Sequence, residues 1–79
     1  MKIYNANNTE NDSVEILLNY QELKKLINSL KKFEDEVSQF KTKNKEAEGL
    51  GFTHLHFKDC GLIAQNSKSD IVLYLNLNE

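Results

Sequence analysis

The chain has 79 residues, of which 39% are hydrophobic and 28% are charged, and its formal net charge is −2. This length predicts a single domain over residues 1–79, and the composition is typical of a globular chain rather than a disordered one. All ten basic residues are lysines. Because arginine is the residue best suited to bidentate recognition of phosphates and bases, we expect no nucleic-acid partner. No stretch approaches the roughly 20 apolar residues of a membrane span, so we expect no membrane partner either.

Cysteine usage and the first residues indicate the compartment. The single cysteine, Cys60, excludes an intramolecular disulfide and permits a reducing compartment. The N-terminal residues have no long apolar run of the signal-peptide kind. We therefore expect a soluble, cytoplasmic protein. A chain of this size buries only roughly 60–65% of its unfolded surface, so help from a partner or from self-association would be unsurprising.

The N-terminal part of the chain predicts two strands. Residues 1–6 form a short alternating segment, residues 7–13 have turn chemistry throughout, and residues 14–18 return as a second strand. Together they predict a hairpin with a loose, polar connection.

A long helix follows, from about Tyr20 to about Lys45. Asn19 is a good N-cap, and Glu22 stands three residues on, as in a capping box. Apolar residues then recur at spacings of three and four: Leu23, Leu26, Ile27, Leu30, Phe33, Val37 and Phe40. Such a helix would run about 39 Å, nearly twice the length of a six-residue strand. It therefore bends, ends early, or carries its last two turns, with Val37 and Phe40, beyond the sheet.

The last third of the chain predicts two more strands, at residues 52–58 and 71–77. In the first, Thr53, Leu55 and Phe57 share one face; in the second, Leu73 and Leu75 belong to the matching aliphatic face. The opposite faces are aromatic and polar and carry Phe52, His54, His56, Val72, Tyr74 and Asn76. A tight turn is expected at residues 58–61, and residues 62–65 could form a short additional strand.

The predicted element order is β-β-α-β-(β)-β. This order describes an α+β domain with an antiparallel sheet of four or five strands and one long helix packed on one face. Because one helix cannot cover both faces, we expect the side with Tyr4, His54, His56 and Tyr74 to be left open.

Two residue sets could carry chemistry, and neither converges. His54 and His56 point the same way on a strand and could share a metal ion, but a site needs three or four ligands. Cys60 with either histidine could form a nucleophilic pair, although Asp59 beside the thiol disfavours the thiolate. We expect no catalytic residues, no metal and no cofactor, and hence no enzyme.

The helix carries a carboxylate run at Glu34, Asp35 and Glu36. Three consecutive helical residues fan apart, so the run is either a solvated band or a surface that recognises a basic partner. The apolar stripe also fits about two and a half heptads, so its second half could serve dimerisation or partner binding.

Three segments together resemble a known family: Gly51-Phe52-Thr53-His54-Leu55-His56-Phe57, Gly61-Leu62, and Ser69-Asp70-Ile71-Val72-Leu73-Tyr74-Leu75. The chain resembles the small α+β immunity proteins of bacterial polymorphic and contact-dependent toxin systems over about residues 14–77. The resemblance implies a non-enzymatic inhibitor that binds a cognate toxin domain, often a nuclease, and blocks its active site or a neighbouring surface.

The functional hypothesis is therefore an immunity protein that neutralises a cognate toxin by occlusion. Its expected partner-binding residues lie on the open face, the acidic band and the end of the helix: Tyr4, Phe52, His54, His56, Tyr74, Glu34, Asp35, Glu36, Val37 and Phe40. The main alternative is a small structural or regulatory module that self-associates, for example as a homodimer, through the helix overhang. A third is a small-molecule or metal binder that uses the two histidines.

Overall fold

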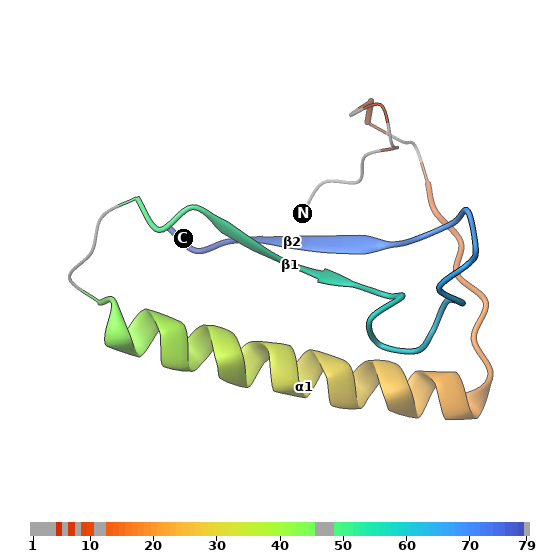
Figure 1. Ribbon diagram of the computed structural model, residues 1–79, viewed down its shortest axis with the longest axis horizontal. Coiled ribbons are helices and arrows are strands. Elements are labelled where there is room, and N and C mark those ends of the chain that lie inside the picture. Colours follow the sequence, from red (N-terminus) through yellow and green to blue (C-terminus); the bar gives the residue numbers. More distant parts are fainter. Residues whose placement is uncertain (1–4, 6, 8, 11–12, 46–48, 79) are drawn as a thin grey trace.

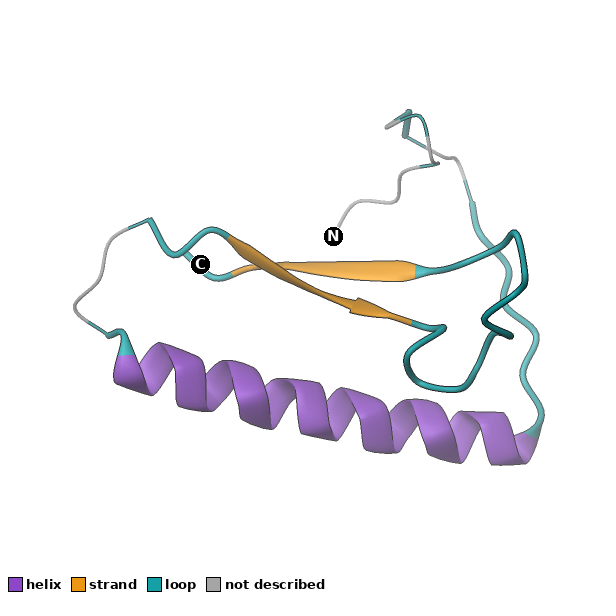
Figure 2. Ribbon diagram, viewed as in Figure 1, coloured by secondary structure: helices purple, strands orange, loops and turns teal. Residues whose placement is uncertain are grey.

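The computed structural model describes residues 5, 7, 9, 10, 13–45 and 49–78. In chain order it contains helix α1 (Tyr20–Lys43), strand β1 (Phe52–His56) and strand β2 (Val72–Asn76). The two strands form an antiparallel hairpin, and the helix runs along one face of it (Figures 1 and 2). The described part of the chain is thus a small α+β structure of two layers.

Local signals determine both ends of α1. The Asn19 side chain accepts a hydrogen bond from the Glu22 backbone N–H at 2.8 Å, and the Glu22 side chain accepts one from the Asn19 N–H at 3.1 Å. This is the predicted capping box. At the other end, the backbone N–H and side-chain amide of Asn44 both donate to the Phe40 carbonyl. The helix is continuous over 24 residues and ends two residues before the expected Lys45.

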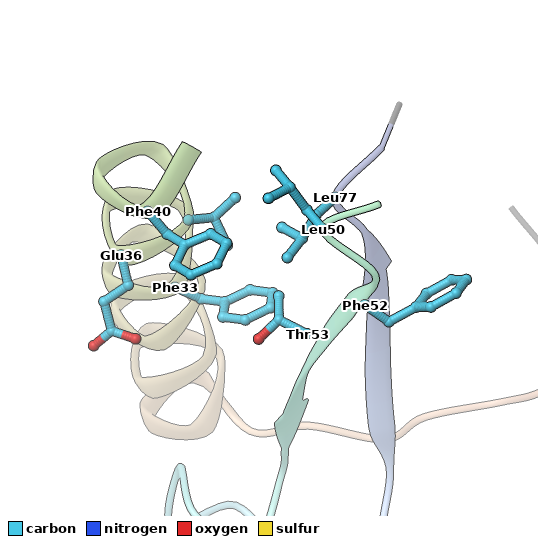
Figure 3. A pocket seen from close by; sticks show the side chains of 8 residues that line it. Phe33, Glu36, Phe40, Leu50, Phe52, Thr53 and Leu77 are labelled. Atoms are coloured by element: carbon cyan, nitrogen blue, oxygen red, sulfur yellow. The ribbon is translucent and has the colours of Figure 1, made fainter. Parts of the chain in front are cut away.

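The hairpin confirms the predicted faces. Thr53 pairs with Leu75 and Leu55 with Leu73, whereas His54 pairs with Tyr74. Because side chains alternate across a strand, the first two pairs lie on one face and the third on the other. Thr53 points toward the helix and Phe52 points away from it (Figure 3). The aliphatic face is therefore the one that α1 covers, and the aromatic face is the outer one.

The core is thin. Among the described residues, only Phe57 and Leu77, at 4% and 5% exposure, are buried hydrophobic side chains, and α1 contributes no buried residue. Phe57 follows β1 and Leu77 follows β2, so each lies at one end of the hairpin. Several side chains of the helical stripe are exposed, Leu23, Ile27 and Leu30 among them. The helix is held near the sheet by partial burial along its length.

The predicted sheet of four or five strands is wrong: the described residues form a sheet of two strands. Residues 14–18 are an irregular connection, and Leu17 is 96% exposed. β-Propensity is realised only when a neighbouring strand supplies hydrogen bonds and packing. The expected partner, residues 1–6, lies outside the described residues except for Asn5.

The predicted short strand at residues 62–65 is also replaced by turns. Backbone N–H groups of Asp59, Cys60 and Gly61 donate to carbonyls three residues back, and Leu62 donates to the Phe57 carbonyl. Within the predicted strand, the Leu62 N–H is used by this turn and the Ala64 carbonyl accepts from the Ser67 N–H, so neither group is offered to a neighbouring strand. Gly61 has a positive φ of 73°, which suits a residue without a side chain at the end of this turn.

Of the three alternatives for the long helix, an overhang that carries Val37 and Phe40 beyond the sheet is not the one observed. Val37 and Phe40 line a hollow together with Leu50 and Leu77, which flank the two strands (Figure 3). At the other end, the turn after β1 approaches the helix: a Cβ placed on Gly61 would lie 3.9 Å from the Lys25 Nζ atom. The helix therefore spans both the strands and their connecting loop. No helix in the described ranges has the length and apolarity that crossing a membrane requires.

Candidate protein-binding surface

The outer face of the hairpin displays aromatic side chains to solvent. Phe52 is 67% exposed and Tyr74 is 71% exposed. The His54 ring lies between Tyr74 and His56, with ring centroids 5.7 Å from the first and 5.0 Å from the second. The two imidazoles meet edge to face, at 88°. The predicted open face therefore exists on the hairpin, as a row of rings on adjacent strands.

His56 is held by Asp70, an acid at the end of the loop that connects the two strands. Its Nδ1 atom lies 2.7 Å from the Asp70 carboxylate. The other Asp70 oxygen accepts from the backbone N–H groups of Lys58 and Ile71, at 3.1 and 2.8 Å. One carboxylate thus joins Lys58, at the start of the turn after β1, to Ile71, the residue that precedes β2. It closes the loop at its base and fixes the orientation of the His56 ring.

Opposing influences act on the pKa of Asp70, and the net result is a lowered value. Partial desolvation of the carboxylate would raise the pKa. The hydrogen bonds from His56, Lys58 and Ile71 stabilise the ionised form and outweigh it, so the pKa falls below the ordinary 3.8. The carboxylate is therefore a stable anion at neutral pH.

The described residues show neither a cluster of metal ligands nor a Cys60–His56 side-chain pair. Among the described residues, no group of three or more histidine, cysteine or acidic side chains is placed to hold a metal ion. The Cys60 Sγ atom donates to the His56 backbone carbonyl at 3.4 Å, whereas the His56 ring is turned toward Asp70. The nucleophilic pair is thus not formed with His56. Zinc binding at His54 and His56 remains untested, and its absence stays a prediction.

The acidic residues of α1 lie on the helix layer and diverge. Successive helical residues are rotated by about 100°, so Glu34 and Glu36 are on different sides of the helix. Asp35 is bonded to Gln39 one turn later, at 3.4 Å. The Glu36 carboxylate points away from the hollow (Figure 3). These carboxylates form a dispersed field along the helix, with no single binding point.

The hollow between the layers has a volume of about 330 Å³. It is mainly apolar, and its lining residues come from the second half of α1 and the nearby hairpin end: Phe33, Glu36, Val37, Phe40, Leu50, Phe52, Thr53 and Leu77. Val37 and Phe40 therefore face the protein's own hairpin. The hollow is present because the helix and the sheet are incompletely packed at this end.

The structure divides the expected partner-binding residues into three groups. Phe52, His54, His56 and Tyr74 are together on the outer face of the hairpin. The acidic residues lie on the helix, in the other layer, and Val37 and Phe40 lie between the layers. Tyr4 is outside the described residues. A partner bound to the outer face would contact the first group. It would interact with the acidic residues only through long-range electrostatics.

Sequence reasoning missed the role of Asp70. An aspartate at the end of a polar loop, directly before a strand, is a known acceptor for nearby backbone N–H groups. That signal was present at Ser69-Asp70-Ile71. Its link to His56 depends on strand register, which the sequence pattern alone does not supply.

Comparisons with known proteins add no relative. No protein-family model, no curated protein and no solved structure matches the chain. Functional hypotheses therefore rest on its own residues and on the surface that they form.

Proposed function

We propose that this chain is a non-enzymatic protein-binding module, and that its partner is a cognate bacterial toxin domain which it neutralises by occlusion. The observation that carries the proposal is the exposed row of Phe52, His54 and Tyr74 on the outer face of the hairpin. Exposed aromatic groups gathered on one face are characteristic of interaction surfaces. The toxin as partner follows from the resemblance of residues 51–75 to immunity proteins.

The hairpin is a suitable support for such a surface. The aromatic side chains stand on paired strands, and Asp70 fixes the loop that joins them. Rigid aromatic anchors lose little conformational freedom when a partner covers them. Occlusion of an active site also requires no chemistry from the inhibitor.

Affinity and rate should depend on different residues. A dissociation constant of 1 nM corresponds to about −12 kcal/mol, and a few buried anchors supply most of such an energy. Phe52 and Tyr74 would fill that role. Glu34, Asp35 and Glu36 lie outside the contact and would act at a distance, by attracting a basic toxin.

The direct experiment is co-expression with the protein encoded immediately upstream. We expect the C-terminal domain of that neighbour to be toxic alone and harmless in the presence of this chain. Tyr74→Ala and Phe52→Ala should each accelerate dissociation of the purified complex. Tyr20→Ala is the matched control, because Tyr20 is a similarly exposed aromatic residue on the helix, at 68%.

Reversal of charge at Glu34, Asp35 and Glu36 should mainly slow association, with an effect that fades as salt is added. A harmless neighbour, or toxicity that persists during co-expression, would refute the immunity role. Equal losses in the Tyr20→Ala and Tyr74→Ala variants would refute the outer face as the binding surface.

A further inference from the structure

In the part of the chain that the structure describes, the outer edge of β2 offers unpaired backbone groups. The Phe57 N–H donates to the Ile71 carbonyl and the Leu77 N–H to the Gly51 carbonyl. Residues of β2 alternate in the direction of their backbone groups, so Leu73 and Leu75 also bond toward β1. Val72, Tyr74 and Asn76 therefore direct their N–H and C=O groups to the other side. Within the described ranges, no strand pairs with that side.

The same strand is the less covered half of the hairpin. On the helix-facing side, Thr53 and Leu55 of β1 are half-buried. Their partners on β2, Leu75 and Leu73, are 39% and 37% exposed. The helix thus covers β1 better than β2, although both leucines belong to the aliphatic face. The exposed leucines on this edge would be covered if a further strand and its helix packed beside β2.

The edge also lacks the usual protection against pairing. Natural edge strands carry charges, prolines or bulges that discourage a second strand. Residues 71–77 contain no charged residue and no proline. On β1, by contrast, the turn folds back, and Asp59 N–H and Cys60 Sγ both bond the His56 carbonyl at the strand's end. The turn thus closes the His56 end of the β1 edge, whereas within the described residues the β2 edge is open along its whole length.

The solvent-accessible surface of the chain is larger than that of a compact monomer of the same mass. The chain exposes 6868 Å². A compact monomer of 9.1 kDa is expected to expose about 4,900 Å². The radius of gyration, 14.4 Å, likewise exceeds the roughly 11.6 Å of a compact chain of this length. The irregular residues 14–18 and the exposed stripe of α1 contribute to this excess as well as the β2 edge, and the excess as a whole is larger than the roughly 800 Å² per partner of a standard interface.

We propose that β2 pairs with β2 of a second copy of this chain, antiparallel and about a twofold axis at Tyr74. The two hairpins then form one continuous four-stranded sheet. Tyr74 N–H bonds the Tyr74 carbonyl of the second copy and the reverse, and Val72 pairs with Asn76 in the same way. This register uses the backbone groups that point outward from β2.

In this register, side chains of the same kind also meet on each face of the sheet. Leu73 stands opposite Leu75 of the second copy on the helix side, and the two tyrosines stand opposite each other on the outer side. Both helices lie on the same face, so the exposed leucines enter a shared core. The dimer leaves Phe52, His54 and Tyr74 on the outer face. It shares Tyr74 with the toxin-binding proposal but does not depend on that proposal.

Sedimentation equilibrium of the wild-type chain should give twice the monomer mass of 9.1 kDa. Tyr74→Lys places two like charges directly opposite each other, and it should weaken the dimer about tenfold or more. His54→Lys is the matched control, since it adds the same charge to the same face on β1, one strand away from the edge. It should leave the dimer unchanged. Circular dichroism should show that both variants stay folded.

A mixture of Tyr74→Lys and Tyr74→Glu tests the axis itself. Each variant alone should be mainly monomeric, and the mixture should restore the dimer, because only a residue on a twofold axis meets its own position in the partner. Hydrogen exchange at the amides of Val72, Tyr74 and Asn76 should slow as protein concentration rises. A wild-type monomer at high concentration, equal effects of the two lysine substitutions, or no rescue in the mixture would each overturn the proposal.

Discussion

The hairpin unit, residues 51–78, and the helix α1 are stabilised in different ways. The hairpin holds both buried hydrophobic side chains of the described chain, Phe57 and Leu77, and a network of bonds that closes its loop through Asp70. The helix has 24 residues and no buried one. Its structure depends on its own hydrogen bonds, its caps and a half-covered apolar stripe. The difference shows that the longest element of the fold, with clear capping signals in the sequence, need not supply the buried core. Here the short hairpin supplies it.

The largest expected effect comes from the hairpin core. Phe57→Ala removes a nearly fully buried ring and should lower the free energy of unfolding by about 3–5 kcal/mol. Phe57→Leu, which keeps most of the apolar volume, should cost about 1–2 kcal/mol and keeps the test measurable if the alanine variant unfolds. Phe52→Ala, on the exposed outer face, is the control and should change stability by less than about 0.5 kcal/mol. Urea denaturation decides, and similar losses for Phe52 and Phe57 would remove the distinction between the two faces.

The sequence predicts the features that depend on local signals and misses those that depend on pairing between distant segments. The start of α1 was predictable because Asn19 and Glu22 are three residues apart and need nothing else. The faces of β1 and β2 were predictable because alternation is a property of each strand by itself. The strand expected at residues 14–18 failed because pairing depends on a neighbour, which no local pattern specifies.

The candidate site also has a part that the sequence predicts and a part that it does not. The outer aromatic row could be predicted from alternation in β1 and β2. The contact of His56 with Asp70 could not, because it joins residues 14 apart through the fold of the loop. Val37 and Phe40 were placed in an overhang, since the sequence did not show that the loop after β1 would extend the hairpin along the helix.

A smaller effect is expected at the helix cap. Asn19→Ala leaves the Glu22 N–H without its side-chain acceptor and should lower the free energy of unfolding by about 1 kcal/mol. Asn28→Ala, at an exposed position inside the helix, is the matched control and should be neutral or slightly stabilising because alanine favours helix. Urea melts followed by far-ultraviolet circular dichroism measure both. A neutral Asn19→Ala would mean that tertiary contacts, rather than the cap, hold the helix.

The Asp70 network should contribute a pH-dependent part of hairpin stability. Because the folded pKa of Asp70 lies below its ordinary 3.8, the contribution is complete above the unfolded value and is lost as pH falls through the folded one. Asp70→Ala should therefore destabilise the protein at pH 7, and its difference from wild type should shrink below pH 3.8. Asp59→Ala, at an exposed position on the adjacent turn, is the control. A difference between wild type and Asp70→Ala that is constant with pH would contradict the ionic role.

The smallest effect is expected from zinc. His54 and His56 stand edge to face, and the Nδ1 atom of His56 is engaged by Asp70. Closure of the hairpin by this carboxylate leaves no structural need for a metal. We expect calorimetric titration to show no stoichiometric zinc binding tighter than micromolar, and unfolding to be unchanged by added zinc. A site with a dissociation constant of 1 µM would stabilise the fold by about 2.7 kcal/mol at a hundredfold excess of zinc over that constant, which a denaturant melt resolves easily. Stabilisation of that size, abolished by His54→Ala, would show that the outer face is a metal site and that the hairpin is not self-sufficient.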